Sequence, residues 1–374
     1  MKYVIDNSNL YAGGGIQVGI SFINDLSKLN LSNEYHIIQS CKMAEAFKKN
    51  DYPCNFIFYD LNVECEQSIL VRAKQVKLLE DQIKPDCIFT LFGPSYHKSN
   101  FPKIVGFAIP HIIYPESPFI KNLSLSKKIK NLLMCKMKQY FFVKNADALV
   151  FETKDASKKF QKLSSFKNNY VVSNTLNEVF LDKSKWERFT FSDKDKLKIL
   201  VVTANYPHKN LQIIPDIIRK LINDKKIENF EFVITLDKNE INFPDFCENY
   251  TQYLGKVSLN KLPSLYKQST IVFIPTLLEV FSATYLEAMY MQKAIVASDM
   301  GFSRDICGDA AFYCDPTNIE DYSNAISLLL RDITLRLDLE KKGVSRVLKF
   351  GTSMDRTKMY LSVMEQVSGR FSDL

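Results

Sequence analysis

Two glutamates in the second half of the chain have the types and the spacing to do chemistry. Glu279 and Glu287 lie eight positions apart in EVFSATYLEAM, which follows the apolar run IVFIP. This pattern predicts a strand, a loop that holds Glu279, and a helix that carries Glu287 and is capped by Ser282 or Thr284. Each carboxylate oxygen accepts hydrogen bonds from hydroxyls. The two side chains can therefore bind the two ends of one elongated ligand, Glu279 the hydroxyls of a sugar and Glu287 those of a ribose.

The first turn of this helix is a candidate binding site for a diphosphate. The backbone N–H groups at a helix N-terminus have no partner inside the helix, and they lie at the positive end of its dipole. Alternatively, the two glutamates only cap and solvate an amphipathic helix. The predicted strand, loop and helix around the motif favour ligand binding.

A lysine follows another predicted strand of the same half. In VVTANYPHKNLQII the strand ends near Thr203, and a helix is expected to start close to Lys209. There the ammonium group can neutralise charge that develops on a leaving diphosphate, with Asn205 or His208 as helpers. The alternative is a solvated lysine in the first turn of a helix.

Apolar runs of strand length alternate with segments of helix length along the chain, which predicts α/β domains with parallel sheets. The pattern breaks at a polar stretch and then restarts, so we expect two facing Rossmann-like domains with ligands at the carboxyl ends of their strands. The expected parts are an acceptor domain at 1–172, a linker at 173–195, a nucleotide-sugar domain at 196–350 and a helical tail at 351–374. The expected strands are 2–6, 35–39, 55–59, 86–91, 103–109, 147–151, 169–172, 197–203, 231–236, 271–275 and 294–298. The expected helices are 16–29, 66–83, 124–145, 153–163, 209–222, one from 282, 319–331, 333–348 and 352–367.

Residues 251–316 resemble the Glu-x7-Glu region of retaining glycosyltransferases with the GT-B fold, in the large bacterial family 4 or glycosyl transferases group 1. The runs YLGKVSLNKLPSLYKQSTIVFIPT before the motif and AIVASDMGFSRDICGDAAFYCDPTN after it are similar to the family's. The likeness covers about 197–330 and is weaker over the first 175 residues. It implies transfer of a hexose-type sugar from a UDP- or GDP-sugar to a saccharide, with a C-terminal helix that packs on the N-terminal domain.

The resemblance also implies roles for individual residues. Catalytic roles fall to Lys209, Glu279 and His111. Donor binding falls to Gly14, Gly15, Asn205, Lys209, Gly255, Lys256, Val257, Leu262, Glu279, Val280, Phe281, Ser282, Ala283, Thr284 and Glu287. The chain departs from the family's EGFG form, since the segment EVFSA from Glu279 to Ala283 contains neither glycine, and the family's arginine near Asn205 is missing. The identity of the donor therefore does not carry over.

Two features of the N-terminal half could also contact ligands. Glycines at 13–15 directly follow the first strand and allow a backbone to approach a ligand closely, although a flexible turn explains them equally well. His111 follows the strand KIVGFAIP, where a neutral imidazole can bond a sugar hydroxyl or accept a proton. The alternative for His111 is a histidine satisfied within a loop.

Residues 121–144 contain seven lysines and no acidic residue. One interpretation is a surface helix whose apolar stripe packs on the core; its members would be Leu125, Ile129, Leu132, Leu133, Met137 and Phe141. The other is a cationic face that rests on anionic lipid, near an acceptor linked to polyprenyl diphosphate. The resemblance implies such an acceptor, in the synthesis of bacterial surface polysaccharide such as O-antigen or capsule.

Composition excludes several classes of protein. A net charge of +7 over 374 residues, without interleaved aromatic and basic residues, does not indicate nucleic acid. Eight scattered cysteines and four histidines have no zinc-binding spacing. No metal or other cofactor is expected, and DKD at 193–195 is interpreted as solvated linker. No signal peptide or membrane span is evident, so we expect a cytoplasmic protein, at most peripheral at the inner face of the membrane.

Two other functions compete with glycosyl transfer. A dinucleotide-dependent oxidoreductase would need GxGxxG after a strand, which the glycines at 13–15 do not form. A non-catalytic nucleotide-sugar-binding partner of a glycosyltransferase complex remains an alternative, because the family's arginine is absent.

Overall fold

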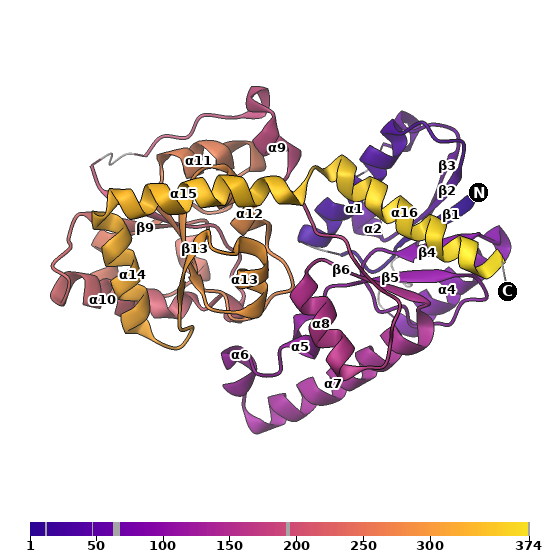
Figure 1. Ribbon diagram of the computed structural model, residues 1–374, viewed down its shortest axis with the longest axis horizontal. Helices are drawn as coiled ribbons and strands as arrows, with labels where there is room; N and C mark the ends of the chain where they lie inside the picture. Colours follow the sequence, from indigo (N-terminus) through magenta and orange to yellow (C-terminus); the bar gives the residue numbers. More distant parts are fainter. Residues whose placement is uncertain (12, 47, 63–67, 192–194, 373–374) are drawn as a thin grey trace. The chain divides into compact units, whose positions relative to one another are not determined.

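A computed structural model of the chain describes residues 1–11, 13–46, 48–62, 68–191 and 195–372 (Figure 1). The chain divides into two compact units. The first comprises Met1–Ile113, Ser124–Asn174 and Thr352–Leu374, and the second comprises Tyr114–Leu123 and Thr175–Gly351.

The first unit is built on a seven-stranded parallel sheet with the order β3-β2-β1-β4-β5-β6-β7. Its strands are β1 (Lys2–Asn7), β2 (Glu34–Gln39), β3 (Phe56–Asp60), β4 (Cys87–Thr90), β5 (Lys103–Phe107), β6 (Ala148–Phe151) and β7 (Asn169–Val171). Most of these runs are apolar and buried, as a sheet covered on both faces requires. The strand order reverses between β1 and β4, and ligands of open α/β sheets bind at such a switch point.

The helices of the first unit are α1 (Gly14–Lys28), α2 (Cys41–Ala44), α4 (Ile69–Ile83), α5 (Pro110–Ile113), α7 (Leu125–Asn145), α8 (Lys154–Leu163) and α16 (Ser353–Ser372), with a 3-10 turn η1 (Lys49–Asp51). The C-terminal helix α16 lies alongside α1 in Figure 1. The ring of Tyr360 packs 5.2 Å from that of Phe22 and 4.9 Å from that of Phe89. At the start of α16, Arg356 donates to the Oγ of Ser21 at 2.8 Å and to the side-chain oxygen of Asn174. The end of the chain thus completes the core of the first unit.

The second unit has a six-stranded parallel sheet with the order β10-β9-β8-β11-β12-β13. Its strands are β8 (Leu197–Val201), β9 (Phe230–Ile234), β10 (Thr251–Tyr253), β11 (Ile271–Ile274), β12 (Ala294–Ser298) and β13 (Ala311–Cys314). Its α-helices are α6 (Pro118–Lys121), α9 (Glu178–Leu181), α10 (Ile214–Asn223), α11 (Leu262–Gln268), α12 (Ala283–Tyr290), α13 (Gly301–Cys307), α14 (Ile319–Arg331) and α15 (Ile333–Val347). Its 3-10 turns are η2 (Lys183–Lys185), η3 (Pro207–Lys209), η4 (Leu211–Ile213), η5 (Lys238–Glu240), η6 (Asp245–Tyr250), η7 (Leu259–Lys261) and η8 (Leu348–Phe350). Here the order reverses between β8 and β11.

All eleven expected strands are present, whereas β10 and β13 were not predicted. The expected helix at 209–222 was wrong at its start. Lys209 closes the 3-10 turn η3, and the 3-10 turn η4 separates it from α10, because Asn210 adopts a left-handed φ of 58° and Pro215 stands in the first turn of the helix. Residues 66 and 67 of another expected helix lie outside the described residues.

Two segments pack differently from the expected division of the chain. Tyr114–Leu123 folds with the second unit, although it lies within the stretch expected to form the acceptor domain. The described part of 173–195 from Thr175 onward also belongs to the second unit. The buried ring of Phe180 packs 5.9 Å from that of Tyr266 there, so this polar stretch is fixed to the domain that follows it.

Candidate active site

Lys209 and Glu279 meet at the switch point of the second sheet. Lys209 closes η3 in the loop after β8, and Glu279 lies in the loop between β11 and α12. The Nζ of Lys209 forms an ion pair with the Oε1 of Glu279. Both side chains are mostly buried, at 19% and 11% exposure. The structure therefore brings together two of the three residues that were expected to be catalytic, at the sheet edge where α/β proteins bind ligands.

The N-terminus of α12 lies four residues beyond Glu279. Ser282 occupies the N-cap position, but its side chain accepts no hydrogen bond, so the expected cap by Ser282 is wrong. The first N–H groups of a helix have no partner within it, and no side-chain cap satisfies them here. Phe281, Ala283 and Thr284 are half-buried around this end. The arrangement fits an anion such as a phosphate group.

Glu287 lies in the second turn of α12, as expected, and its side chain is deeply buried. Its Oε2 accepts a hydrogen bond from the hydroxyl of Tyr266 at 2.8 Å. Burial raises the pKa of Glu287 to about 7, although the Tyr266 hydrogen bond acts in the opposite direction. Sequence reasoning missed Tyr266, because a tyrosine in a short amphipathic helix such as α11 has no distinguishing pattern.

Four of the residues expected to bind the donor follow β10 in the chain. Gly255 has a φ of +65°, and a Cβ there would lie 2.6 Å from the Oδ1 of Asp237, so glycine is required at this turn. Lys256 is exposed, Val257 is half-buried, and Leu262 is 7% exposed at the start of α11. The segment forms a tight turn after the strand, with apolar side chains beside it.

Three other donor-site candidates have different surroundings. The side-chain amide of Asn205 donates to the carbonyl of Glu240, which directs it toward η5. Val280 is only 4% exposed, while Ala283 is half-buried at the helix start. The ring of His208, the other candidate helper, stacks on that of Tyr206 at 5.5 Å.

The glycines of the first unit form the start of α1. Gly13 has a φ of +70°, a conformation that favours glycine, and the helix begins at Gly14 rather than at residue 16. A Cβ on Gly14 would meet nothing within 4 Å, whereas one on Gly15 would approach a Leu10 methyl at 3.2 Å. The N-cap residue Gly13 has no side chain with which to cap this helix, and the first N–H groups of such a helix start can bind an anion.

His111 lies in the short helix α5, after β5. Burial, with a smaller contribution from the positive charge of Lys138, lowers the pKa of His111 below its usual value. The imidazole is therefore mainly neutral at pH 7, as accepting a proton from a sugar hydroxyl requires.

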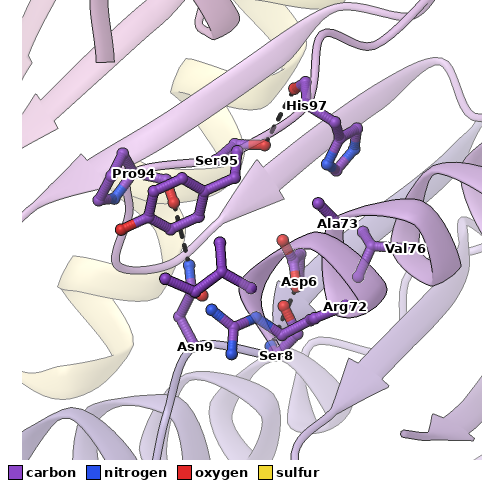
Figure 2. A pocket seen from close by; sticks show the side chains of 11 residues that line it. Asp6, Ser8, Asn9, Arg72, Ala73, Val76, Pro94, Ser95 and His97 are labelled. Atoms are coloured by element: carbon purple, nitrogen blue, oxygen red, sulfur yellow. Dashed lines mark hydrogen bonds between the residues drawn. The ribbon is translucent and has the colours of Figure 1, made fainter. Parts of the chain in front are cut away.

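A small pocket lies at the switch point of the first sheet, between the loops after β1 and β4 and helix α4 (Figure 2). Its lining consists of Asp6, Ser8, Asn9, Ile69, Arg72, Ala73, Val76, Pro94, Ser95, Tyr96 and His97. The Asn9 amide donates to the carbonyls of Phe92 at 3.1 Å and Pro94 at 3.3 Å, and the Arg72 guanidinium bonds the Tyr11 hydroxyl. Sequence reasoning missed this pocket, although the polar run DNSN at the end of the first strand was a signal for it.

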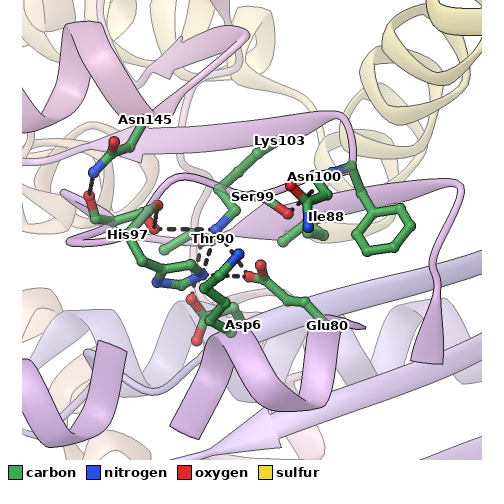
Figure 3. A network of polar contacts seen from close by, with 12 residues as sticks. Asp6, Glu80, Ile88, Thr90, His97, Ser99, Asn100, Lys103 and Asn145 are labelled. Carbon is green, nitrogen blue, oxygen red and sulfur yellow. Dashed lines mark hydrogen bonds and ion pairs between the residues drawn. The ribbon is translucent and has the colours of Figure 1, made fainter. Parts of the chain in front are cut away.

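A buried ionic network holds the loop that lines this pocket (Figure 3). The Nζ of Lys103 lies 2.8 Å from the Oε1 of Glu80 and 2.8 Å from the Nε2 of His97, which itself lies 2.9 Å from that Oε1. Burial alone would raise the pKa of Glu80, but the His97 hydrogen bond and the Lys103 charge hold it below its usual value. The Asn145 amide donates to the carbonyl of Ser95 at 2.8 Å. These contacts tie the loop to α4, β5 and α7.

Helix α7 exposes its apolar stripe, contrary to the interpretation that packs it on the core. The exposed fractions are 75% for Leu125, 52% for Ile129, 54% for Leu132, 63% for Leu133 and 46% for Met137. The helix packs inward through Phe142, Cys135 and Asn145 instead. Phe141 is the exception in the stripe, since it is half-buried with its ring 5.1 Å from that of Tyr96.

Two surveys cover only the residues that the structure describes. None of their helices is long and apolar enough to cross a membrane. Nor do they contain a cluster of three or more histidine, cysteine or acidic side chains that could hold a metal ion. Residues 193 and 194 of the DKD run lie outside this part of the chain.

Solved structures share this two-unit architecture. Sucrose-phosphate synthase from Thermosynechococcus elongatus superposes with a TM-score of 0.74 at 12% identity, over 99% of this chain and 100% of that one. An Anabaena protein, Alr3699/HepE in complex with UDP-glucose, superposes with a TM-score of 0.69 at 13% identity over 100% of both chains. The fold is that of the GT-B glycosyltransferases, with two Rossmann-like units.

A family model matches part of the sequence. Residues 182–346 match the model described as "Glycosyl transferases group 1", so the chain carries a domain of this glycosyltransferase family. The O-antigen chain mannosyltransferase RfbU of Salmonella typhimurium is 22% identical over 47% of this chain and 48% of its own. A Campylobacter jejuni protein named N,N'-diacetylbacillosaminyl-diphospho-undecaprenol alpha-1,3-N-acetylgalactosaminyltransferase is 25% identical over 61% of this chain and 60% of its own. The alignments thus span about half to three fifths of the length of these two curated relatives.

Proposed function

We propose that this chain is a retaining glycosyltransferase that moves a hexose-type sugar from a UDP- or GDP-sugar to a saccharide acceptor. The observation that carries the proposal is the ion pair between Lys209 and Glu279. The pair lies at the switch point of the second sheet, and Glu279 shortly precedes the N-terminus of α12, which has no side-chain cap. A cation and a helix N-terminus are the groups that a diphosphate leaving group needs, and a carboxylate suits sugar hydroxyls.

The donor would engage these groups in a fixed order along its length. Lys209 and the first N–H groups of α12, at Ser282 and Thr284, would bind the diphosphate and stabilise its charge as the bond to the sugar breaks. Glu279 would accept hydrogen bonds from the sugar hydroxyls, and Glu287 from the ribose hydroxyls. No metal ion is required in this scheme, because Lys209 and the helix N-terminus supply the positive charge.

The acceptor would bind to the first unit. The Figure 2 pocket lies at the switch point of that sheet, where open α/β sheets bind ligands, but its volume of about 10 Å³ has room for little more than one water molecule, so the acceptor would bind beside it rather than inside it. His111 is mainly neutral and could bond the reacting hydroxyl, and the open start of α1 at Gly14 and Gly15 could bind a phosphate. Each of these features follows the carboxyl end of a strand.

We further propose that the acceptor is linked to a polyprenyl diphosphate and that α7 rests on anionic lipid at the inner face of the cytoplasmic membrane. Seven exposed large hydrophobic side chains, Tyr140 and Val143 included, stand among the lysines of this acid-free helix, a combination typical of helices that lie in a membrane interface. The names of the Salmonella and Campylobacter relatives, an O-antigen transferase and an undecaprenol-diphosphate-dependent transferase, agree with a role in bacterial surface polysaccharide synthesis.

A thermal-shift screen against UDP, GDP and ADP, followed by the matching sugar nucleotides, tests the donor assignment. We expect stabilisation by one nucleoside diphosphate and by its sugar nucleotides. No shift with any of them would argue against the proposal.

The second candidate, a non-catalytic nucleotide-sugar-binding partner, is favoured by one observation. The family's arginine is absent, and Asn205 in its place bonds the Glu240 carbonyl. Binding of a sugar nucleotide without hydrolysis or transfer, in the presence of acceptor lipid, would support this alternative over an enzyme.

A further inference from the structure

Residues Tyr114–Leu123, here called the arm, leave the first unit after α5 and return to it at α7, but they fold with the second unit. Tyr114 is fully buried there, and its ring lies 5.6 Å from that of Phe302. Ser117, at the N-cap of α6, is also fully buried. The arm is therefore an integral part of the second unit.

The arm bonds the loop that carries Glu279. The Oγ of Ser117 donates a hydrogen bond to the carbonyl of Leu277 at 2.7 Å, between residues 160 positions apart. The N–H of Leu277 donates to the carbonyl of His208 at 2.8 Å. The backbone of Leu277 is thus held on one side by the arm and on the other by the loop that carries Lys209.

The arm also touches the second loop directly. The ring of Phe119 lies edge-on to that of His208, with centroids 5.9 Å apart. His208 immediately precedes Lys209, and Leu277 stands two residues before Glu279. The contacts of Ser117 and Phe119 therefore fall one or two residues from the two members of the ion pair.

We propose that Ser117 is a positioning residue, through which the arm fixes the spacing between the Lys209 and Glu279 loops. This inference rests on the proposed function, because it assigns the arm to the donor site. Long side chains such as Lys209 and Glu279 hold a productive geometry only when the backbone beneath them is fixed. A serine hydroxyl has one proton to donate, and Ser117 donates it to Leu277.

Another buried serine provides a matched control. The Oγ of Ser323 donates to the carbonyl of Ile319 at 2.8 Å within α14, and Ser323 is also fully buried in the second unit. The variants Ser117→Ala and Ser323→Ala each lose one buried hydroxyl-to-carbonyl hydrogen bond, and Ser117→Ala also loses the bond that Ser117 accepts from the N–H of Phe119 within the arm. Only the first should disturb the donor loops.

Hydrogen exchange followed by mass spectrometry tests the proposal without any ligand. In Ser117→Ala we expect peptides covering 203–210 and 275–282 to exchange about tenfold faster than in the wild type, as loss of one hydrogen bond implies. Ser323→Ala should leave both peptides unchanged. Equal protection in Ser117→Ala and the wild type would overturn the proposal. If Ser117→Ala does not fold, Phe119→Leu takes its place, with faster exchange of 203–210 expected and unchanged exchange contradicting the proposal.

Donor kinetics give the second readout. Ser117→Ala should lower kcat/KM about tenfold in the wild-type background and much less in a Lys209→Met background, because coupled residues act non-additively. Additive effects would overturn the positioning role. A wild-type protein that turns over no sugar nucleotide would contradict the proposed function, whereas the exchange experiment would still decide the role of Ser117.

Discussion

Lys209 and Glu279, 70 residues apart in the sequence, form an ion pair between the loops that follow β8 and β11. These strands are neighbours at the point where the order of the sheet reverses. The pair thus occupies the position at which open α/β sheets bind ligands. The proposed donor site is centred on this pair.

Replacing Lys209 tests its proposed role in leaving-group stabilisation. Lys209→Met should lower kcat/KM for the donor by roughly 10²- to 10³-fold, the usual effect of removing one preorganised charge-stabilising group. Lys225→Met is the matched control, because the Nζ of Lys225 also pairs with a glutamate of the second unit, Glu320, at 2.7 Å. Similar losses in the two variants, measured by release of nucleoside diphosphate, would indicate a general effect on the fold.

The stability of the ligand-free protein should depend on pH through Glu287. Its pKa is about 7 in the folded chain and 4.5 as the ordinary value, so the unfolded chain releases this proton first. The contribution of Glu287 to stability is then complete below about pH 4.5 and is lost as the pH rises through about 7, by an amount on the order of 3 kcal/mol.

Denaturant titrations between pH 5 and 8.5 check this dependence. The loss of folding stability with rising pH should be smaller in Glu287→Gln, which carries no titrating group at this position. In Tyr266→Phe the loss of folding stability should continue to higher pH, because the Tyr266 hydrogen bond lowers the pKa of Glu287 and the variant lacks it. Identical slopes in the wild type and Glu287→Gln would rule out the buried carboxyl as the cause.

Nucleotide binding should report on the same proton. If the ionised Glu287 accepts hydrogen bonds from ribose hydroxyls, affinity should rise with pH between about 6 and 8, since binding favours the charged form. Calorimetry in buffers of different ionisation enthalpy would detect the released proton. Binding that is independent of pH, with no proton released, would contradict the ribose assignment.

Helix α7 should bind anionic vesicles. Exchanging Lys127 and Lys128 for glutamine should weaken co-sedimentation by about tenfold or more, at about 1 kcal/mol for each charge near the surface. The double exchange of Lys158 and Lys162 on α8 removes the same charge from the same unit and should have little effect. Equal binding to neutral and anionic vesicles would exclude the electrostatic part of the proposal.

Chelation should not abolish activity. With Lys209 and the N-terminus of α12 supplying positive charge, turnover in EDTA should match turnover in magnesium. A loss of rate in EDTA that magnesium or manganese restores would show that a metal ion takes part.

Much of the fold could be predicted because its strands are short, apolar and regularly spaced. The start of α10 could not, since it depends on the left-handed conformation of Asn210, which an asparagine can adopt but need not. The attachment of the arm to the second unit could not be predicted from the sequence either. It rests on contacts such as that between Ser117 and Leu277, whose partners are 160 residues apart.

The candidate site was predicted unevenly for similar reasons. Glu279, Glu287 and Lys209 follow strands in a recognisable motif, and the structure brings Glu279 and Lys209 into contact. The sequence left two interpretations of α7 open, because helical spacing reveals an apolar stripe but not what covers it. The Figure 2 pocket draws on segments near residues 6, 72 and 96, which only the folded sheet brings together.

The central claim is donor turnover at the Lys209 and Glu279 site, and the most direct measurement is the release of nucleoside diphosphate from UDP- and GDP-sugars. The account predicts that the wild-type protein releases UDP or GDP from at least one sugar nucleotide, and that Lys209→Met and Glu279→Gln lose this activity while remaining folded. Release that is absent from the wild type, or equal in both variants and the wild type, would contradict it.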